Sequence, residues 1–219
     1  VEKIDTSLSG GAPSTGYGLT ETHGIVTANS GSLYVAKPSS CGRVVPTLEA
    51  KLVDEFDNEV PPGETGELCV RGAIVIKGYL NRPEATADSI RDGWFHTGDV
   101  ARIDEDGFVF IVDRIKDMVL RGGENVYCSE VEAAIYELVG VAEVAVFGVP
   151  DDRLGEIVGA AIVLAPGAAM TEDQLRSALG SHLAKFKIPE RVWFLNDALP
   201  RNANGKFVKR DLKESLLGV

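Results

Sequence analysis

The sequence has 219 residues, of which 44% are hydrophobic and 25% charged, and its formal net charge is −11. That length suits one large domain or two small ones, and the composition is that of a globular protein able to bury a core. The acidic balance argues against nucleic acid as a partner, and no apolar run approaches the roughly 20 residues that a membrane-spanning helix needs.

Short strands are expected through the first half of the chain. Residues 1–24 are rich in Gly, Ser and Thr, which is typical of loops whose backbone approaches a ligand. Beyond residue 42, short apolar runs separated by turn residues predict strands, and we expect this block to form a small β-barrel or a pair of sheets. The predicted strands are 48–54, 67–72, 73–80 and 108–112, with turns at 61–66 and 104–107 and a helix at 83–90.

Helices and strands alternate in the second half of the chain. Ser129 with Glu132, and Thr171 with Gln174, match the capping box found at helix starts. The order helix–strand–strand–helix–strand–helix indicates a small α+β domain with a short central sheet flanked by helices. The predicted helices are 129–141, 171–186 and 209–217, and the predicted strands are 142–149, 156–164 and 191–195.

The charged segment 113–117, with the sequence DRIKD, lies between these two blocks and is the predicted domain junction. It divides the chain into predicted domains of residues 1–115 and 116–219. The fold class expected for the whole is therefore α+β.

The three cysteines, Cys41, Cys69 and Cys128, are widely spaced and include no CxxC pair. This pattern argues against a disulfide framework or a zinc site and favours a reducing compartment. No basic segment followed by an apolar one opens the sequence, so no secretory signal is expected and a cytoplasmic location is predicted.

A basic tail stands out from the acidic chain. Between Lys185 and Lys213, eight basic residues stand against three acidic ones, which gives a net charge of +5. Such a segment indicates either an anionic ligand or a solvated helix face.

Two polar motifs offer groups that bind a nucleotide. In GYGLTE (16–21), Gly18 lets the backbone pass close to a ligand, Thr20 offers a hydroxyl to a phosphate, and Glu21 offers Mg²⁺ the hard oxygen that it prefers. In DGWFHTGD (92–99), the carboxylate of Asp99 can accept hydrogen bonds from two vicinal hydroxyls, as on a ribose, or form an Asx-turn. His96 in the same motif is more often structural than catalytic.

Two further motifs place special residues on tight turns. LPRNANGK (199–206) presents Lys206 after Asn-Gly, so its point charge is available to a phosphate, although a solvated lysine beside a hairpin fits equally. In MVLRGGENVY (118–127), Gly122 and Gly123 either line a narrow tunnel or form a turn.

Seven motifs occur here in the same order as in one superfamily. Together they resemble the acyl-CoA synthetases, peptide-synthetase adenylation domains and firefly-type luciferases, which form acyl-adenylates. The resemblance covers nearly the whole chain, and its C-terminal forms look most like medium- or long-chain fatty-acid or aryl acyl-CoA ligases. The motifs are GGAP (10–13), GYGLTE (16–21), GELCVRG (66–72), GYLNRPEAT (78–86), DGWFHTGD (92–99), DRIKDMVLRGGENVY (113–127) and LPRNANGK (199–206).

The resemblance implies a nucleotide site in the first domain, which would be the end of a large adenylating domain. Its β-rich part would be barrel-like. Asp99 would hold the ribose hydroxyls with help from Arg114, and Thr20 would touch the AMP phosphate. The full set implied for the nucleotide is Gly11, Ala12, Pro13, Tyr17, Gly18, Thr20, Asp99 and Arg114.

The resemblance also implies a two-step reaction that uses ATP, Mg²⁺, CoA and a small carboxylic acid. Lys206 would act with Thr20 and Glu21 in forming acyl-AMP, and Glu21 would bind the Mg²⁺. The second domain would then rotate about Lys116, and the Gly122–Gly123 loop would border the pantetheine tunnel.

The chain departs from the family pattern in two respects. It has no Ser/Thr/Gly-rich phosphate loop of the kind that family members carry far upstream. In addition, only Ser14 and Thr15 separate GGAP from GYGLTE, where the family has a helix-bearing segment. Parallel strands need a crossover of a dozen or more residues, so we hypothesise that this sequence joins pieces that are separate in the family.

The sequence leaves three functions open. We expect an incomplete acyl-CoA ligase, inactive alone, of which this chain is the C-terminal part. The alternatives are an adenylation domain that loads a carrier protein and a non-catalytic nucleotide-binding homologue. Which acid is used, and the oligomeric state, are unspecified.

Overall fold

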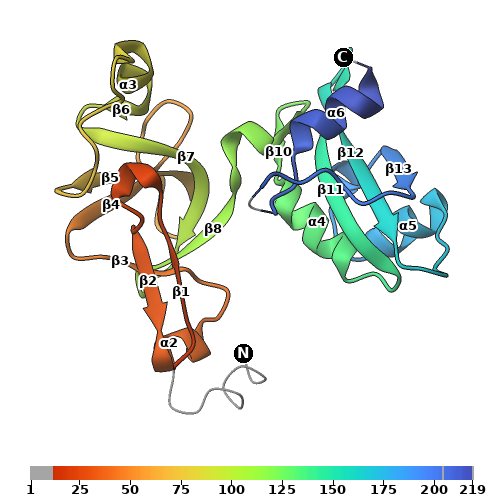
Figure 1. Cartoon of the computed structure of the whole chain (residues 1–219), viewed down its shortest axis with the longest axis horizontal. Coiled ribbons are helices and arrows are strands. Elements are labelled where there is room, and N and C mark those ends of the chain that lie inside the picture. The colour runs from red at the N-terminus through yellow and green to blue at the C-terminus, as the bar shows by residue number, and fades with distance from the viewer. Residues whose placement is uncertain (1–11, 204, 219) are drawn as a thin grey trace. The chain divides into compact units, whose positions relative to one another are not determined.

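The computed structural model describes residues 12–203 and 205–218 of the chain. The chain divides into two compact units, Val1–Ile115 and Lys116–Val219 (Figure 1). The division falls inside the charged segment 113–117 that separates the two sequence blocks. The functional roles predicted for the two domains stay predictions.

The first unit is built on one eight-stranded antiparallel sheet rather than on two sheets. The strand order is β1-β2-β3-β8-β7-β5-β4, and β6 pairs with β7. Short helices α2 (Gly31–Ala36) and α3 (Pro83–Ser89) lie at opposite ends of this unit (Figure 1). The strands are β1 (Ser14–Tyr17), β2 (Thr27–Ser30), β3 (Gly42–Val44), β4 (Leu48–Val53), β5 (Thr65–Gly72), β6 (Ile90–Arg91), β7 (Trp94–Ile103) and β8 (Phe108–Arg114).

Two predictions for the first unit are wrong. Residues 14–17 are not loop: they form β1, because they pair along their length with β2. Residues 73–80 are not a strand, because Val75 N donates to Gly72 O to close a turn and Ile76 N donates to Glu21 O. The apolar side chains of this segment pack against the core from an irregular loop.

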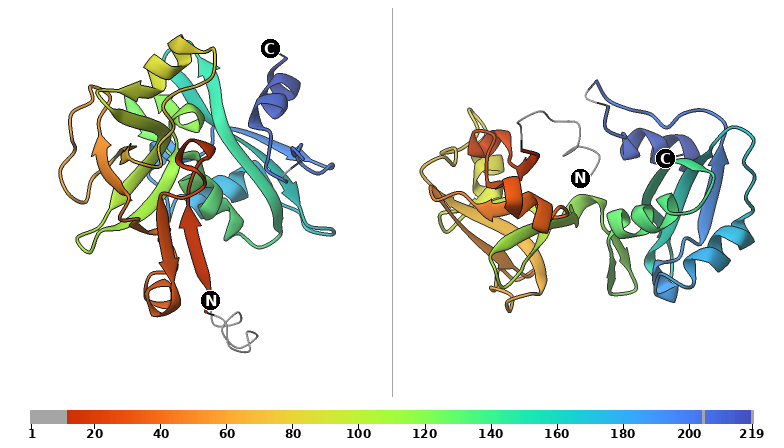
Figure 2. Two further views of the ribbon diagram at one scale, coloured as in Figure 1. Left: turned by 60° about the vertical axis from the view of Figure 1, so that its left-hand side comes forward. Right: turned by 90° about the horizontal axis from the view of Figure 1, so that it is seen from below.

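The second unit has a five-stranded sheet with helices on both faces. Alternate residues of β11 face opposite ways: Val144 and Val146 pack with α4 and α5, while Ala145 and Phe147 pack with α6, which lies across the sheet from α5 (Figure 2). The elements are η2 (Ile115–Asp117), β9 (Val119–Arg121), β10 (Glu124–Val126), α4 (Cys128–Tyr136), β11 (Val141–Asp151), β12 (Gly155–Leu164), α5 (Glu172–Leu179), η3 (Lys185–Lys187), β13 (Arg191–Leu195) and α6 (Lys209–Leu217). The α+β class is confirmed. No helix of the described residues is both long and apolar enough to cross a membrane.

The predicted capping box at Thr171 forms. Thr171 Oγ1 accepts from Gln174 N, and Gln174 Oε1 accepts from Thr171 N, so α5 begins as predicted. The helix start predicted at Ser129 is wrong, because the N-cap of α4 is Tyr127. Glu132 accepts from Val146 N at 2.8 Å and pairs with Lys209 at 2.7 Å, so it joins α4 to β11 and α6.

Truncating the core of the second unit should destabilise it strongly. Ile135 is fully buried between α4 and the sheet, so Ile135→Ala should lower the free energy of unfolding by about 2–5 kcal/mol in urea denaturation. Val139 is 96% exposed, and Val139→Ala should change it by less than about 0.5 kcal/mol. Equal effects of the two substitutions would contradict this account of the core.

Candidate functional site

A buried carboxylate lies at the centre of the first unit's site. Asp99, on β7, is 3% exposed and faces Arg114 across the β7–β8 pair. Arg114 Nε donates to Asp99 Oδ1 at 2.7 Å, and Tyr17 Oη donates to Oδ2. Three of the predicted nucleotide residues, from β1, β7 and β8, therefore meet at one point.

The Tyr17 phenol keeps its proton because of its surroundings. Burial, together with the hydrogen bond to Asp99, raises the pKa of Tyr17 well above its usual value, so its phenol is a stable donor. A carboxylate has about four lone-pair directions, and Tyr17 and Arg114 use two of them. Two remain for vicinal hydroxyls. The Arg114 side chain is 47% exposed, so it forms the solvent-facing side of the cluster.

The segment that carries Asp99 is a strand with a bulge and not the predicted turn. The β7–β8 register shifts between Val100 and Ala101, and Gly98 has a φ of +72°, which favours glycine. Thr97 Oγ1 donates to Leu68 O at 2.7 Å and accepts from Asp99 N at 3.1 Å. The backbone at Asp99 is thereby fixed to the neighbouring strand β5.

The GYGLTE loop packs tightly beside β1. A Cβ on Gly18 would lie 2.2 Å from Gly24 O, so only glycine fits there. Glu21 lies in the short helix η1 (Thr20–Thr22), and its Oε1 accepts from Tyr79 Oη at 2.9 Å. Burial, and then the hydrogen bond to Glu21, raises the pKa of Tyr79. The Thr20 residue is exposed.

The loop also fits the predicted cation. Glu21 is partly exposed, and its Oε2 makes no hydrogen bond to the residues that the structure describes. Thr20 adds a hydroxyl next to it, and Mg²⁺ prefers such hard oxygens while sharing others with phosphates. In the GGAP motif, Ala12 is exposed and Pro13 is buried, whereas Gly11 lies outside the described residues.

Lys206 stands on an exposed hairpin of the second unit. Asn202 Oδ1 accepts from Lys206 N at 3.0 Å, and an isolated bridge joins Arg201 to Phe207. Glu143, on β11, anchors the base of this hairpin: it accepts from Leu199 N at 2.7 Å and from Arg201 at 2.8 Å. The lysine is thus held on a short turn whose base is fixed to the sheet.

Acid should loosen this anchor. The Arg201 guanidinium, and then the Leu199 amide, hold the pKa of Glu143 below its usual value. Because the folded pKa is the lower one, the stabilisation is present above the unfolded pKa of about 4.3 and is lost as pH falls through the folded value. The melting-temperature difference between the wild type and Glu143→Gln should therefore shrink as pH falls from 6 to 3. A difference that is constant with pH would contradict the assignment.

The remaining predicted residues also lie in the second unit. Gly122 and Gly123 have φ values of +60° and +91° and form the two-residue turn between β9 and β10, as type I′ hairpin turns require. Lys116 is exposed in η2, at the unit boundary. It also lines a cavity of about 740 Å³ together with the lysines of α6, Lys209 and Lys213.

Two family profiles match the chain. The AMP-binding enzyme profile matches residues 7–80, and the AMP-binding enzyme C-terminal domain profile matches residues 130–206. The chain belongs to the AMP-binding enzyme family. It spans only 36–40% of the length of the curated relatives that it matches.

Relatives within this family are named as CoA ligases. The chain is 47% identical to a long-chain-fatty-acid–CoA ligase of Salmonella typhimurium, covering 93% of this chain and 36% of that protein. It is 44% identical to a feruloyl-CoA synthase of an Amycolatopsis species, covering 90% and 40%. The crystal structure of ATP-bound MatB from Rhodopseudomonas palustris matches with a TM-score of 0.85 and 42% identity, over 92% of this chain and 40% of that one.

Several contacts that hold the candidate site residues of the two units were not predicted from the sequence. Tyr79 holds Glu21, Thr97 holds the backbone of Asp99, and Glu143 holds the Lys206 hairpin. Tyr79 and Thr97 lie inside motifs that the sequence analysis quotes, which is the one sequence feature that could have pointed to them. Glu143 lies in a strand with no motif.

Proposed function

We propose that this chain supplies the C-terminal part of an acyl-CoA ligase, which activates a carboxylic acid with ATP and transfers the acyl group to CoA. The observation that carries this proposal is the buried Asp99 carboxylate, held by Tyr17 and Arg114 with two lone-pair directions left for ribose hydroxyls. The names of the CoA-ligase relatives support it.

In the first step, a carboxylate oxygen attacks the α-phosphorus of ATP, and pyrophosphate leaves. Asp99 and Arg114 fix the ribose, Tyr17 lies against the adenine with Gly11, Ala12 and Pro13, and Thr20 contacts the α-phosphate. A Mg²⁺ ion at Glu21 would supply charge neutralisation to the phosphates. Lys206 places a positive charge against the charge that develops on the transferred group, since such chemistry depends on positioning and electrostatics.

In the second step, the CoA thiol attacks the acyl carbonyl and AMP leaves. The second unit turns about Lys116, which withdraws Lys206 and brings the Gly122–Gly123 turn to the site. The location of Lys116 at the boundary of the two units supports a hinge there, because a few residues at an element end can absorb the backbone change. We propose a cytoplasmic enzyme with a small-molecule acid as its substrate.

An alternative function is the transfer of the acyl group from the same adenylate to a nucleophile other than CoA. A matching structure is the amide bond synthetase McbA from Marinactinospora thermotolerans, at 33% identity and a TM-score of 0.83. Loading of a carrier protein belongs to the same class. CoA is preferred because curated relatives acting on fatty, aromatic and succinylbenzoic acids are all named for CoA.

Product analysis distinguishes these acceptors. The full-length ligase that would contain this chain is incubated with ATP, Mg²⁺, CoA and a panel of fatty and aromatic acids, and the products are identified by mass spectrometry. We expect a free CoA thioester together with AMP and pyrophosphate. An adenylate that accumulates with CoA present but reacts with an amine or a carrier protein would reject the CoA proposal.

A further inference from the structure

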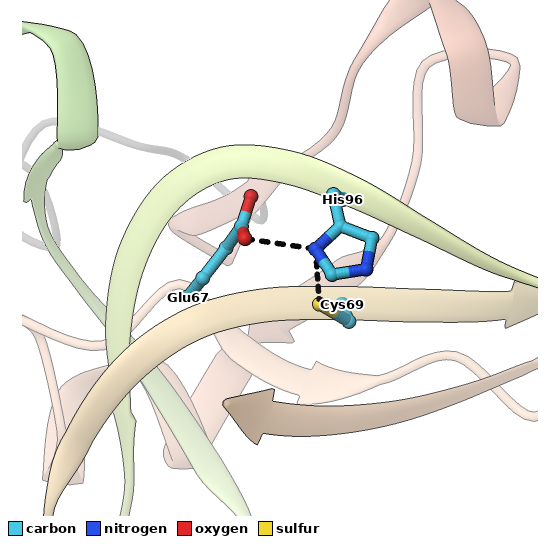
Figure 3. Close-up of side chains that lie close together, drawn as sticks. All are labelled: Glu67, Cys69 and His96. Carbon is cyan, nitrogen blue, oxygen red and sulfur yellow. Dashed lines mark hydrogen bonds and ion pairs between the residues drawn. The ribbon is translucent and has the colours of Figure 1, made fainter. Parts of the chain in front are cut away.

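Three side chains with metal-ligating atoms lie together on the first sheet. Glu67 and Cys69 come from β5 and His96 from β7, and their ligand atoms lie within 4.8 Å of one another (Figure 3). His96 Nδ1 is 2.8 Å from Glu67 Oε2 and 3.3 Å from Cys69 Sγ. The mechanism proposed above uses none of them.

A metal ion is not the best account of this cluster. The Arg91 guanidinium lies 2.6 Å from His96 Nδ1 and pairs with Asp57 at 3.0 Å, so a positive charge already occupies the place of a cation. Burial, and then the charge of Glu67, raises the pKa of Cys69 to about 12, so its thiol keeps its proton at neutral pH. The Arg91 guanidinium thus already supplies a positive charge beside the Glu67 and Asp57 carboxylates.

Glu67 has a second contact that points to the nucleotide site. Its Oε1 accepts from Gly98 N at 3.0 Å, at the residue whose positive φ lets the backbone turn toward Asp99. The β5–β7 register shifts between Glu67 and Cys69. At this irregularity the Glu67 carboxylate, in place of a backbone carbonyl of the neighbouring strand, accepts the hydrogen bond from Gly98 N. Figure 3 shows Glu67 reaching from β5 toward His96 on β7.

Residues 96–98 of β7, which precede Asp99, are each held by a contact from β5. His96 is held by Glu67 and Cys69, Thr97 by Leu68 O, and Gly98 by Glu67. Asp99 follows directly, and its two oxygens are shared with Tyr17 and Arg114. A displacement at Gly98 is therefore passed on to the Asp99 carboxylate.

We propose that Glu67 is a positioning residue that aims Asp99 at the ribose hydroxyls by holding the Gly98 amide, while its other oxygen lies 3.7 Å from the Arg91 guanidinium. This inference rests on the proposed nucleotide site. It assigns Glu67 no contact with substrate, so its effect is confined to interactions that depend on the ribose hydroxyls.

The test compares the affinity of the protein for ATP and for 2′,3′-dideoxy-ATP, which lacks both hydroxyls. We expect Glu67→Ala to weaken ATP binding about tenfold and to leave dideoxy-ATP binding unchanged. Glu67→Gln should restore ATP binding, because its amide oxygen still accepts from Gly98 N. The matched control is Glu49→Ala, which removes a 65%-exposed carboxylate paired with Arg71 on the same sheet. It should change neither affinity.

The outcomes separate the two proposals. If the wild type prefers ATP and Glu67→Ala keeps the same preference, the positioning role is overturned while the nucleotide site stands. If the wild type binds both nucleotides equally, the ribose assignment of Asp99 fails and the positioning role fails with it. Hydrogen exchange at the Gly98 amide gives a check independent of nucleotide: it should quicken in Glu67→Ala only. A stoichiometric divalent metal bound by the wild type and lost in Glu67→Ala would instead make the cluster a metal site.

Discussion

Replacing Lys206 by alanine should lower the rate of acyl-adenylate formation about 10²- to 10³-fold, the loss seen when one preorganised charge or donor is removed from a transition state. Thioester formation from supplied acyl-AMP should stay close to the wild-type rate, because the proposed mechanism withdraws the lysine in that step. Lys206 is exposed on a hairpin whose base is anchored to β11 through Glu143. Both half-reactions are followed by single-turnover kinetics.

The matched control for this substitution is Lys213→Ala, in α6, which removes a lysine of the same basic tail that lines the cavity of the second unit. It should leave adenylation unchanged if the effect belongs to Lys206 and not to the overall charge of the tail. Equal losses in the two half-reactions of Lys206→Ala would reject the assigned role.

Replacing Asp99 by alanine should weaken ATP binding about 10- to 100-fold, because hydrogen bonds from both ribose hydroxyls to a charged group are lost. The substitution also leaves the Arg114 guanidinium and the Tyr17 phenol without their shared acceptor. The pKa of Tyr17 should therefore fall back toward its usual value, since part of its rise comes from Asp99. Equilibrium titration with ATP and ultraviolet titration of the phenol measure the two effects.

Asp106→Ala is the control for Asp99. Asp106 is 66% exposed at the β7–β8 hairpin, where it pairs with Lys37, so its loss should leave ATP affinity unchanged. If Asp99→Ala binds ATP like the wild type, Asp99 is a structural carboxylate and the ribose role is wrong.

Helix starts that depend on neighbouring residues in the sequence were predictable. The capping pair Thr171 and Gln174 marks the start of α5, and Pro83 begins α3 at a position where its missing N–H costs nothing. The predicted strand at 73–80 does not form. Its apolar side chains pack against the core, but its backbone hydrogen bonds go to Gly72 and Glu21. Apolar content alone does not distinguish a strand from a buried loop.

The site shows the same limit. Motif residues such as Tyr17, Asp99 and Arg114 could be named from the sequence, but the Tyr17–Asp99 hydrogen bond joins residues 82 positions apart, and Asp99 meets Arg114 only through the β7–β8 pairing. The supporting contacts of Tyr79 and Glu67 are long-range as well, and no local pattern announces them. Glu132 likewise has long-range contacts, to Val146 N and Lys209, that its place in a local helix-start pattern did not predict.

The most direct test of the account is carboxylic-acid-dependent exchange of labelled pyrophosphate into ATP by the full-length ligase that would contain this chain, in the wild type and in Asp99→Ala. We predict exchange that requires both an acid and Mg²⁺, and that falls sharply in Asp99→Ala with a raised KM for ATP. Exchange with no acid dependence, or an unchanged KM in Asp99→Ala, would contradict the claim that this chain holds the ribose of ATP while an acyl-adenylate forms.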